Sequence, residues 1–263
     1  GNYQHAETLA HDALELEPRN PWAQHALSHA LIREGRIERG IERMEGFMPL
    51  LKTCDPLILC HNAWHLALLY LEQLDEANAQ RIFNERIWMN LPDTVGEQID
   101  AIALAWRMEM VGFSMGDFWQ QVCEHALPHA TQVLTPFLSA HFAYALARGG
   151  QDEALAALLA NVSHRAEIDD EEGRHIWAPV GRNLVEASAA SAQEQHSKCA
   201  KLLQPAIESV MCAGGSDAQV DLFRATYAHS LVQSGKQAEA TSFRRHWIPL
   251  KLPTPLDAKL FQN

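Results

Sequence analysis

The chain has 263 residues, of which 47% are hydrophobic and 21% charged, and its formal net charge at pH 7 is −12. This composition is typical of a globular protein with a large core and excludes a mainly disordered chain. The 21 Lys and Arg residues are scattered. A nucleic-acid partner is therefore not expected, because phosphate binding needs clustered basic side chains.

The sequence predicts neither a membrane span nor a signal peptide. Its longest apolar stretches, such as Leu66 to Leu71, fall far short of the roughly 20 residues of a transmembrane helix. The five cysteines form no CxxC motif and are odd in number, which favours partly buried thiols in a reducing compartment. We therefore expect a cytoplasmic protein.

Apolar residues recur at helical spacing almost from end to end, which predicts an all-α fold. Proline and glycine divide the chain into helices of roughly 12 to 20 residues. In chain order, the predicted breaks are Pro18 to Pro21, Gly35, Asp55-Pro56, Leu91-Pro92, Gly112 to Gly116, Thr135-Pro136, Gly149-Gly150, Ala213 to Ser216, Gly235 and Pro253 to Pro255.

A repeat signature overlies these helices. Residues 6–18 match the small-residue pattern and terminal proline of the second helix of a tetratricopeptide repeat. The segments EGRIERG, EQLDEA, GGQDEA and SGKQAEA each predict a tight turn between two paired helices. Residues 101–135 and 167–214 match poorly, so irregular helical pairs are expected there. The pattern predicts one domain over residues 1–263, a right-handed superhelix of antiparallel helix pairs.

The first helix, Gly1 to Leu16, matches the second helix of a repeat whose first helix is missing. Its alanine-rich face would then lack a cover, which repeat arrays avoid by capping. Another element could cover this face. We favour the alternative that the chain is the C-terminal part of a longer protein.

Several motifs together resemble the tetratricopeptide-repeat protein 38 family. They are HALSHALIREGR, CHNAWHLAL, the acidic Asp100, LAWRMEMVG, FLSAHFAYALARGG around His141, and GGSDAQVDLF around Asp217, in that order. The resemblance covers most of the chain. It implies a superhelical repeat fold with a longer N-terminal part, and it implies no particular reaction.

Two histidine pairs with i,i+4 spacing are the leading candidate for a site: His25 with His29, and His61 with His65. This spacing puts both rings of a pair on one helix face, so adjacent helices can bring all four together. Repeat alignment puts His61 and His65 at packing positions. The residues expected to line a concave groove are Trp22, His25, His29, Asn62 and Trp64.

Three interpretations of the histidine cluster remain open. The rings could simply bridge helices through hydrogen bonds. They could form the polar floor of a groove that binds a peptide, a protein or a small molecule. They could also act chemically, either as ligands of a divalent transition metal or as general bases. No HExxH motif is present, so a zincin-type protease is not predicted.

Asp100 and Arg107 are candidate partners for a chemical site, because a catalytic or metal-bound imidazole needs an orienting acidic group. They lie close to two helical turns apart and could point the same way along a groove. The alternative is an ordinary pair of surface charges. A Cys60 thiolate activated by His25 or His29 is a further alternative.

Other candidates lie in the second half of the chain. Ser216 or Asp217 can cap the helix that follows the Gly214-Gly215 turn. Asp217 and Asp221 could close a groove opposite His141, which itself falls at a packing position. His229 is expected to face the groove. The sequence thus favours a groove-binding protein, with an enzyme on the same scaffold as the alternative.

Overall fold

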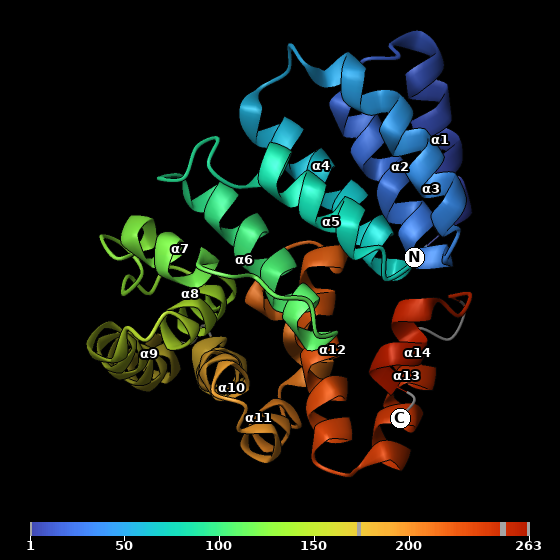
Figure 1. Ribbon diagram of the computed structural model, residues 1–263. Helices are drawn as coiled ribbons and strands as arrows, with labels where there is room; N and C mark the ends of the chain where they lie inside the picture. Colours follow the sequence, from blue (N-terminus) through green and yellow to red (C-terminus); the bar gives the residue numbers. More distant parts are fainter. Residues whose placement is uncertain (1, 173–174, 248–250, 262–263) are drawn as a thin grey trace. The chain divides into compact units, whose positions relative to one another are not determined.

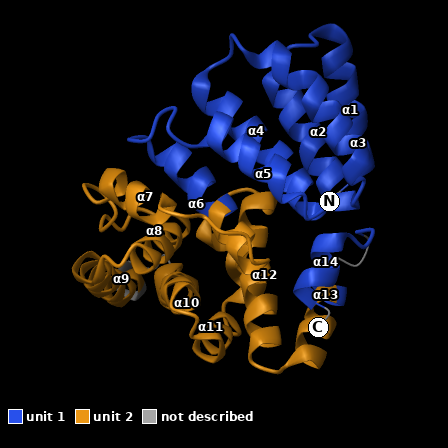
Figure 2. Ribbon diagram, in the orientation of Figure 1, with its two compact units in different colours: residues 1–104, 245–262 blue, residues 105–244, 263 orange. Residues whose placement is uncertain are grey.

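The computed structural model describes residues 2–172, 175–247 and 251–261, and within these ranges every regular element is a helix (Figure 1). The prediction of an all-α fold is confirmed for this part of the chain. The sequence pattern predicts one continuous domain, whereas the structure divides into two compact units (Figure 2). Unit 1 comprises residues 1–104 and 245–262, and unit 2 comprises residues 105–244 and 263.

In unit 1, α2 packs against α1, α3 and α4, while α4 packs against α5 and α14. A buried cluster of Ala10, Leu27 and Leu31 joins α1 to α2. The elements are α1 (Tyr3–Leu16), α2 (Pro21–Glu34), α3 (Ile37–Phe47), the 3-10 helix η1 (Met48–Leu51), α4 (Pro56–Glu72), α5 (Glu76–Ile82), the π-helical turn η2 (Phe83–Ile87), α6 (Val95–Met110) as far as Leu104, and α14 (Pro255–Phe261).

In unit 2, α8 packs against α7, α9 and α10, and α11 packs against α10 and α12. The ring of Trp106 stacks on that of Tyr144, with centroids 3.9 Å apart, in the core of this unit. Its elements are the end of α6, α7 (Phe118–Ala126), α8 (Pro136–Arg148), α9 (Asp152–Glu172), the π-helical turn η3 (Trp177–Gly181), α10 (Arg182–Ala192), α11 (His196–Leu203), the 3-10 helix η4 (Ile207–Ala213), α12 (Asp217–Gln233) and α13 (Gln237–Trp247) as far as Arg244.

One turn geometry recurs between paired helices. In each case a residue with positive φ stands two positions before the second helix begins. The four turns predicted from the sequence have it, and a fifth, between α10 and α11, lies in a segment expected to be irregular. These five residues are Gly35, Leu74, Gly150, Glu194 and Gly235. Leu74 and Glu194 carry side chains in a conformation that favours glycine, which costs each about 1 to 2 kcal/mol.

The helix starts follow from local chemistry. Asn20 and Asp55 accept hydrogen bonds from the first backbone N–H groups of α2 and α4, and a proline follows each cap. Proline at this position loses no hydrogen bond, because the first N–H groups of a helix have no intrahelical acceptor. Ser216 caps α12 and forms a capping box with Gln219, as the sequence predicts for this turn. These caps set where α2, α4 and α12 begin.

The C-terminal segment of unit 1 is held on α4 by a buried charge network. Both carboxylate oxygens of Glu72 accept from Lys251 Nζ at 2.7 Å, and one also accepts from Thr254 Oγ1 at 2.6 Å. Lys251 and Glu72 side chains are each 9% exposed. None of the described helices is long and apolar enough to cross a membrane.

Candidate functional site

The two histidine pairs meet on the packed faces of α2 and α4 in unit 1. His25 lies 4.8 Å from His65, centroid to centroid, and His29 lies 4.5 Å from His65. His61 is 5.0 Å from both His25 and His65. The prediction that i,i+4 pairs on adjacent helices converge is therefore confirmed.

Three of these rings bring nitrogen atoms close together. Ligand atoms of His25, His29 and His65 all lie within 4.8 Å of one another. The Nε2 atoms of His25 and His29 are 3.0 Å apart. Burial, assisted by the neighbouring His29 and His61, lowers the pKa of His25 to about 3. His25 is consequently neutral at pH 7, and its Nε2 atom donates or accepts the hydrogen bond with His29, which a metal ion would replace.

His61 is instead directed to a carboxylate. Its Nδ1 atom lies 2.8 Å from Asp100 Oδ2, and the two side chains are only 19% and 8% exposed. Burial acts to lower the pKa of His61, but the charge and hydrogen bond of Asp100 outweigh it, so the pKa is raised. Donation from Nδ1–H to Asp100 leaves Nε2 as the nitrogen with the lone pair.

Trp64 and Asn62 support this arrangement from inside the core. The rings of His61 and Trp64 are stacked, with centroids 5.4 Å apart. The Asn62 amide donates to the carbonyls of Ile58 and Pro21 and so ties α4 to α2. Both side chains are fully buried. The prediction that Asn62 and Trp64 face an open groove is therefore wrong, since they lie in the helix packing itself.

Trp22 is the groove candidate that does reach the surface. Its side chain is 65% exposed, and its ring meets the His25 ring edge-on with centroids 6.1 Å apart. His25 and His29 are half-buried, whereas His65 is fully buried, as its packing position predicts. The cluster is thus open to solvent on the side of α2 that carries Trp22.

The alternative of a Cys60 nucleophile does not agree with the structure. Cys60 is buried, and its Sγ donates to the Ile87 carbonyl at 3.7 Å. Burial, together with the negative charges of Asp100 and Glu97, raises the pKa of this thiol. Cys60 therefore remains a protonated thiol, and all five cysteines of the chain are free.

The remaining candidates belong to unit 2, where most have structural partners. Arg107 is buried and donates to the Ala218 carbonyl at 2.7 Å. Asp221 pairs with Arg224 at 2.9 Å, and Asp217 is the first residue of α12 after the Ser216 cap. The start of α12 and its packing therefore account for all three residues.

His141 is fully buried in unit 2 rather than lining a groove. Its Nδ1–H donates to the Phe137 carbonyl of the same helix at 2.8 Å, and its ring lies against those of Phe137 and Phe223. Among the described residues, no polar group lies within hydrogen-bonding distance of its Nε2. His141 thus occupies the packing position that the repeat alignment gives it.

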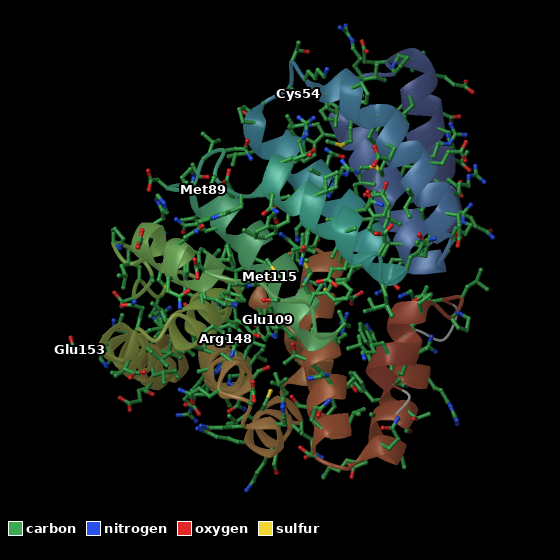
Figure 3. The ribbon with its side chains drawn as sticks, viewed as in Figure 1. Cys54, Met89, Glu109, Met115, Arg148 and Glu153 are labelled. Atoms are coloured by element: carbon green, nitrogen blue, oxygen red, sulfur yellow. The ribbon has the colours of Figure 1, made fainter. Side chains whose placement is uncertain are left out.

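Sequence reasoning missed two polar groupings in unit 2. His229 meets His196 edge-on at 5.4 Å, although His196 shows no partner pattern in the sequence. Glu109 accepts from Trp119 Nε1, Tyr144 OH and Arg148 Nη2 (Glu109 and Arg148 are labelled in Figure 3). These partners lie 10 to 39 residues from Glu109. No spacing rule connects such residues, so only tertiary packing reveals the grouping.

Comparison with known proteins adds no assignment. No protein-family model matches the chain, and no solved structure matches it.

Proposed function

We propose that the chain is an enzyme that hydrolyses a small molecule or a peptide, with His61 as its acid–base group. The observation that carries this proposal is the 2.8 Å hydrogen bond between His61 Nδ1 and the nearly buried carboxylate of Asp100. A carboxylate in this position fixes the imidazole tautomer and stabilises the imidazolium that forms when His61 accepts a proton.

The surroundings of His61 support water as the nucleophile. His61 contacts other imidazoles, the Trp64 ring and Asp100. Cys60, its neighbour in sequence, is held as a thiol. A general base that removes a proton from water therefore explains the arrangement better than a covalent mechanism does.

A binding module is the second candidate, and the exposed Trp22 beside His25 favours it. Exposed aromatic side chains next to polar rings are common anchors of ligands and peptides. For such a module we expect Trp22→Ala to weaken ligand binding while changing stability by less than about 0.5 kcal/mol. The enzyme is preferred because recognition alone does not require a buried carboxylate behind His61.

The proposal also covers the larger setting of the site. We infer that the helical hairpins continue as a right-handed, tetratricopeptide-repeat-like superhelix of the tetratricopeptide-repeat protein 38 type. Five free cysteines support a reducing compartment, and the cytoplasm is the one we propose. The acidic net charge of −12 supports a substrate other than nucleic acid.

The test is turnover of activated substrates by wild type and by a His61→Asn variant. The panel contains p-nitrophenyl esters, an anilide and a phosphomonoester, assayed near pH 7.5. We expect hydrolysis of at least one carboxylic ester or amide, reduced about 10²- to 10⁴-fold in the variant. His5→Asn, which changes an exposed histidine of α1, is the matched control and should keep full activity. Equal rates for His61→Asn and wild type would reject the proposal.

A further inference from the structure

We propose that His25, His29 and His65 bind one divalent transition-metal ion, zinc by preference, with a water molecule in the fourth position. This inference deepens the proposed function and rests on it for the role of that water. Binding of the ion itself is independent of any reaction. Its basis is the convergence of three imidazoles from two packed helices.

The distances fit a tetrahedral ion with little rearrangement. Zinc–nitrogen bonds of about 2.0 to 2.1 Å place two ligands about 3.3 Å apart in a tetrahedral site. The Nε2 atoms of His25 and His29 are 3.0 Å apart, and no two ligand atoms of the triad are more than 4.8 Å apart. To close the set, the most distant ligand atoms must approach by up to about 1.5 Å. We expect side-chain torsions to supply this approach, because i,i+4 spacing on α2 already puts two ligands on one face.

The donor chemistry selects the class of metal. Three imidazole ligands suit zinc, cobalt, nickel or copper, whereas calcium and magnesium prefer oxygen ligands. The Cys60 thiol is not available as a ligand, because Cys60 is buried and bonded to the Ile87 carbonyl. A site of three protein ligands with one open position is the pattern of catalytic rather than structural zinc.

His61 lies beside this triad without belonging to it. It contacts His25 and His65, both at 5.0 Å between centroids, while Asp100 holds its Nδ1. This separates a binding role for three histidines from a proton-transfer role for the fourth. The same four-residue pattern in the sequence therefore gives two different functions.

The separation defines a balanced hydrolytic step. The metal-bound water transfers a proton to His61, and the resulting hydroxide forms a bond to the carbonyl carbon of an ester or amide. The tetrahedral intermediate then breaks its bond to the leaving oxygen or nitrogen, which takes the proton back from His61. No electrons are exchanged with another molecule, and water is the only co-reactant.

The experiment measures metal binding by tag-free protein that has been treated with chelator and dialysed. Titration calorimetry with Zn²⁺ and elemental analysis after gel filtration should both give one ion per chain. Co²⁺ should produce the intense visible absorption of a four-coordinate site. A His25→Asn, His29→Asn double variant should bind Zn²⁺ roughly 100-fold more weakly or not at all. Both residues are half-buried, so this variant is chosen over one at the fully buried His65.

His5→Asn is the control and should bind Zn²⁺ with unchanged stoichiometry and with an affinity within about threefold of wild type. His61→Asn should keep the stoichiometry of one ion, because His61 supplies no ligand. Circular dichroism and urea unfolding establish that every variant is folded. If the double variant does not fold, His25→Gln alone is used, with the same expected direction and at least about a tenfold loss. Wild type that binds no stoichiometric Zn²⁺ or Co²⁺, or a folded variant that binds as well as wild type, overturns the metal site.

The failures of the two proposals are distinguishable. Turnover that depends on His61 but survives complete removal of metal would overturn the metal site and leave the acid–base function standing. Stoichiometric Zn²⁺ held by the triad, without turnover that depends on His61, would overturn the function and leave the metal site standing. Restored activity on adding Zn²⁺ to the metal-free protein, in wild type but not in the double variant, supports both.

Discussion

The histidine cluster of unit 1 and His141 of unit 2 show two opposite uses of the same side chain. In unit 1, His61 is oriented by a carboxylate, and nitrogen atoms of three further rings, two of them half-buried, lie within 4.8 Å of one another. In unit 2, His141 is sealed among aromatic rings and bonds only its own helix through Nδ1. The difference teaches that the chemistry of an imidazole depends on the groups that surround its ring. A carboxylate prepares the ring for proton transfer, whereas an apolar enclosure keeps it neutral.

Asp100→Asn tests the carboxylate side of this comparison and has the largest expected effect. The substitution keeps the shape of the side chain but removes the charge that stabilises the His61 imidazolium. We expect turnover to fall between about 10²- and 10⁴-fold, while the free energy of unfolding changes by about 1 kcal/mol or less. Steady-state kinetics on the best substrate of the panel and urea unfolding are the measurements.

A different result for Asp100→Asn would show that the histidine cluster and His141 do not differ in their use of histidine. If Asp100→Asn left turnover intact and lowered the free energy of unfolding by several kcal/mol, the His61–Asp100 pair would be a structural link. Unit 1 and unit 2 would then both use histidine for packing. A control at the exposed His5 gives the background of each assay.

His141→Phe tests the sealed side of the comparison through its pH dependence. Burial, with a contribution from the nearby Arg107 charge, lowers the pKa of His141 to about 4, against 6.5 for a free histidine. As the pH falls below 6.5 the unfolded chain gains a proton that the folded chain resists until about pH 4. His141 therefore lowers the free energy of unfolding by about 3 kcal/mol on acidification through this range.

The phenyl ring of His141→Phe occupies similar space and cannot be protonated. The free energies of unfolding of wild type and of His141→Phe are measured with urea at pH 7 and at pH 4. At pH 7 they should agree within about 1 kcal/mol. At pH 4 the variant should be more stable than wild type by about 3 kcal/mol. His25 and His229, whose pKa values are also lowered, are present in both proteins and cancel from the difference. If wild type and His141→Phe lost the same free energy of unfolding between pH 7 and pH 4, His141 would not be enclosed as described.

Sequence reasoning located the histidine site because the controlling geometry was local. The i,i+4 spacing determines which rings share a helix face, and the Asn20-Pro21 and Asp55-Pro56 caps determine where α2 and α4 begin. Asp100 emerged as a candidate acid from its residue type and the family resemblance. Its bond to His61, 39 residues earlier in the chain, depends on how α6 packs and follows no spacing rule.

The sequence-based expectations that failed concerned the rotation of α4 about its axis and the backbone conformation of turns. Adjacent helix residues point about 100° apart, so repeat alignment without the true helix packing assigned Asn62 and Trp64 to an open groove. Their burial follows from the contact between α4 and α2. The turn at Glu194 was missed because glycine normally marks a positive φ and this turn has none at that position, whereas the EQLDEA motif predicts the turn at Leu74.

Glu194→Gly is the smallest predicted effect and separates backbone strain from the side-chain environments compared above. Glu194 has φ 58° and is exposed in the turn between α10 and α11, so the substitution relieves strain while removing little packing. We expect the free energy of unfolding to rise by about 1 kcal/mol at both pH 7 and pH 4.

Gln193→Gly is the matched control, since Gln193 is also exposed but has φ −90°. There glycine only adds freedom to the unfolded chain and should lower the free energy by about 0.5 to 1 kcal/mol. Equal and unfavourable effects at both positions would mean that Glu194 carries no strain. A gain at Glu194 that vanished at pH 4 would point to its charge, because backbone strain does not depend on pH.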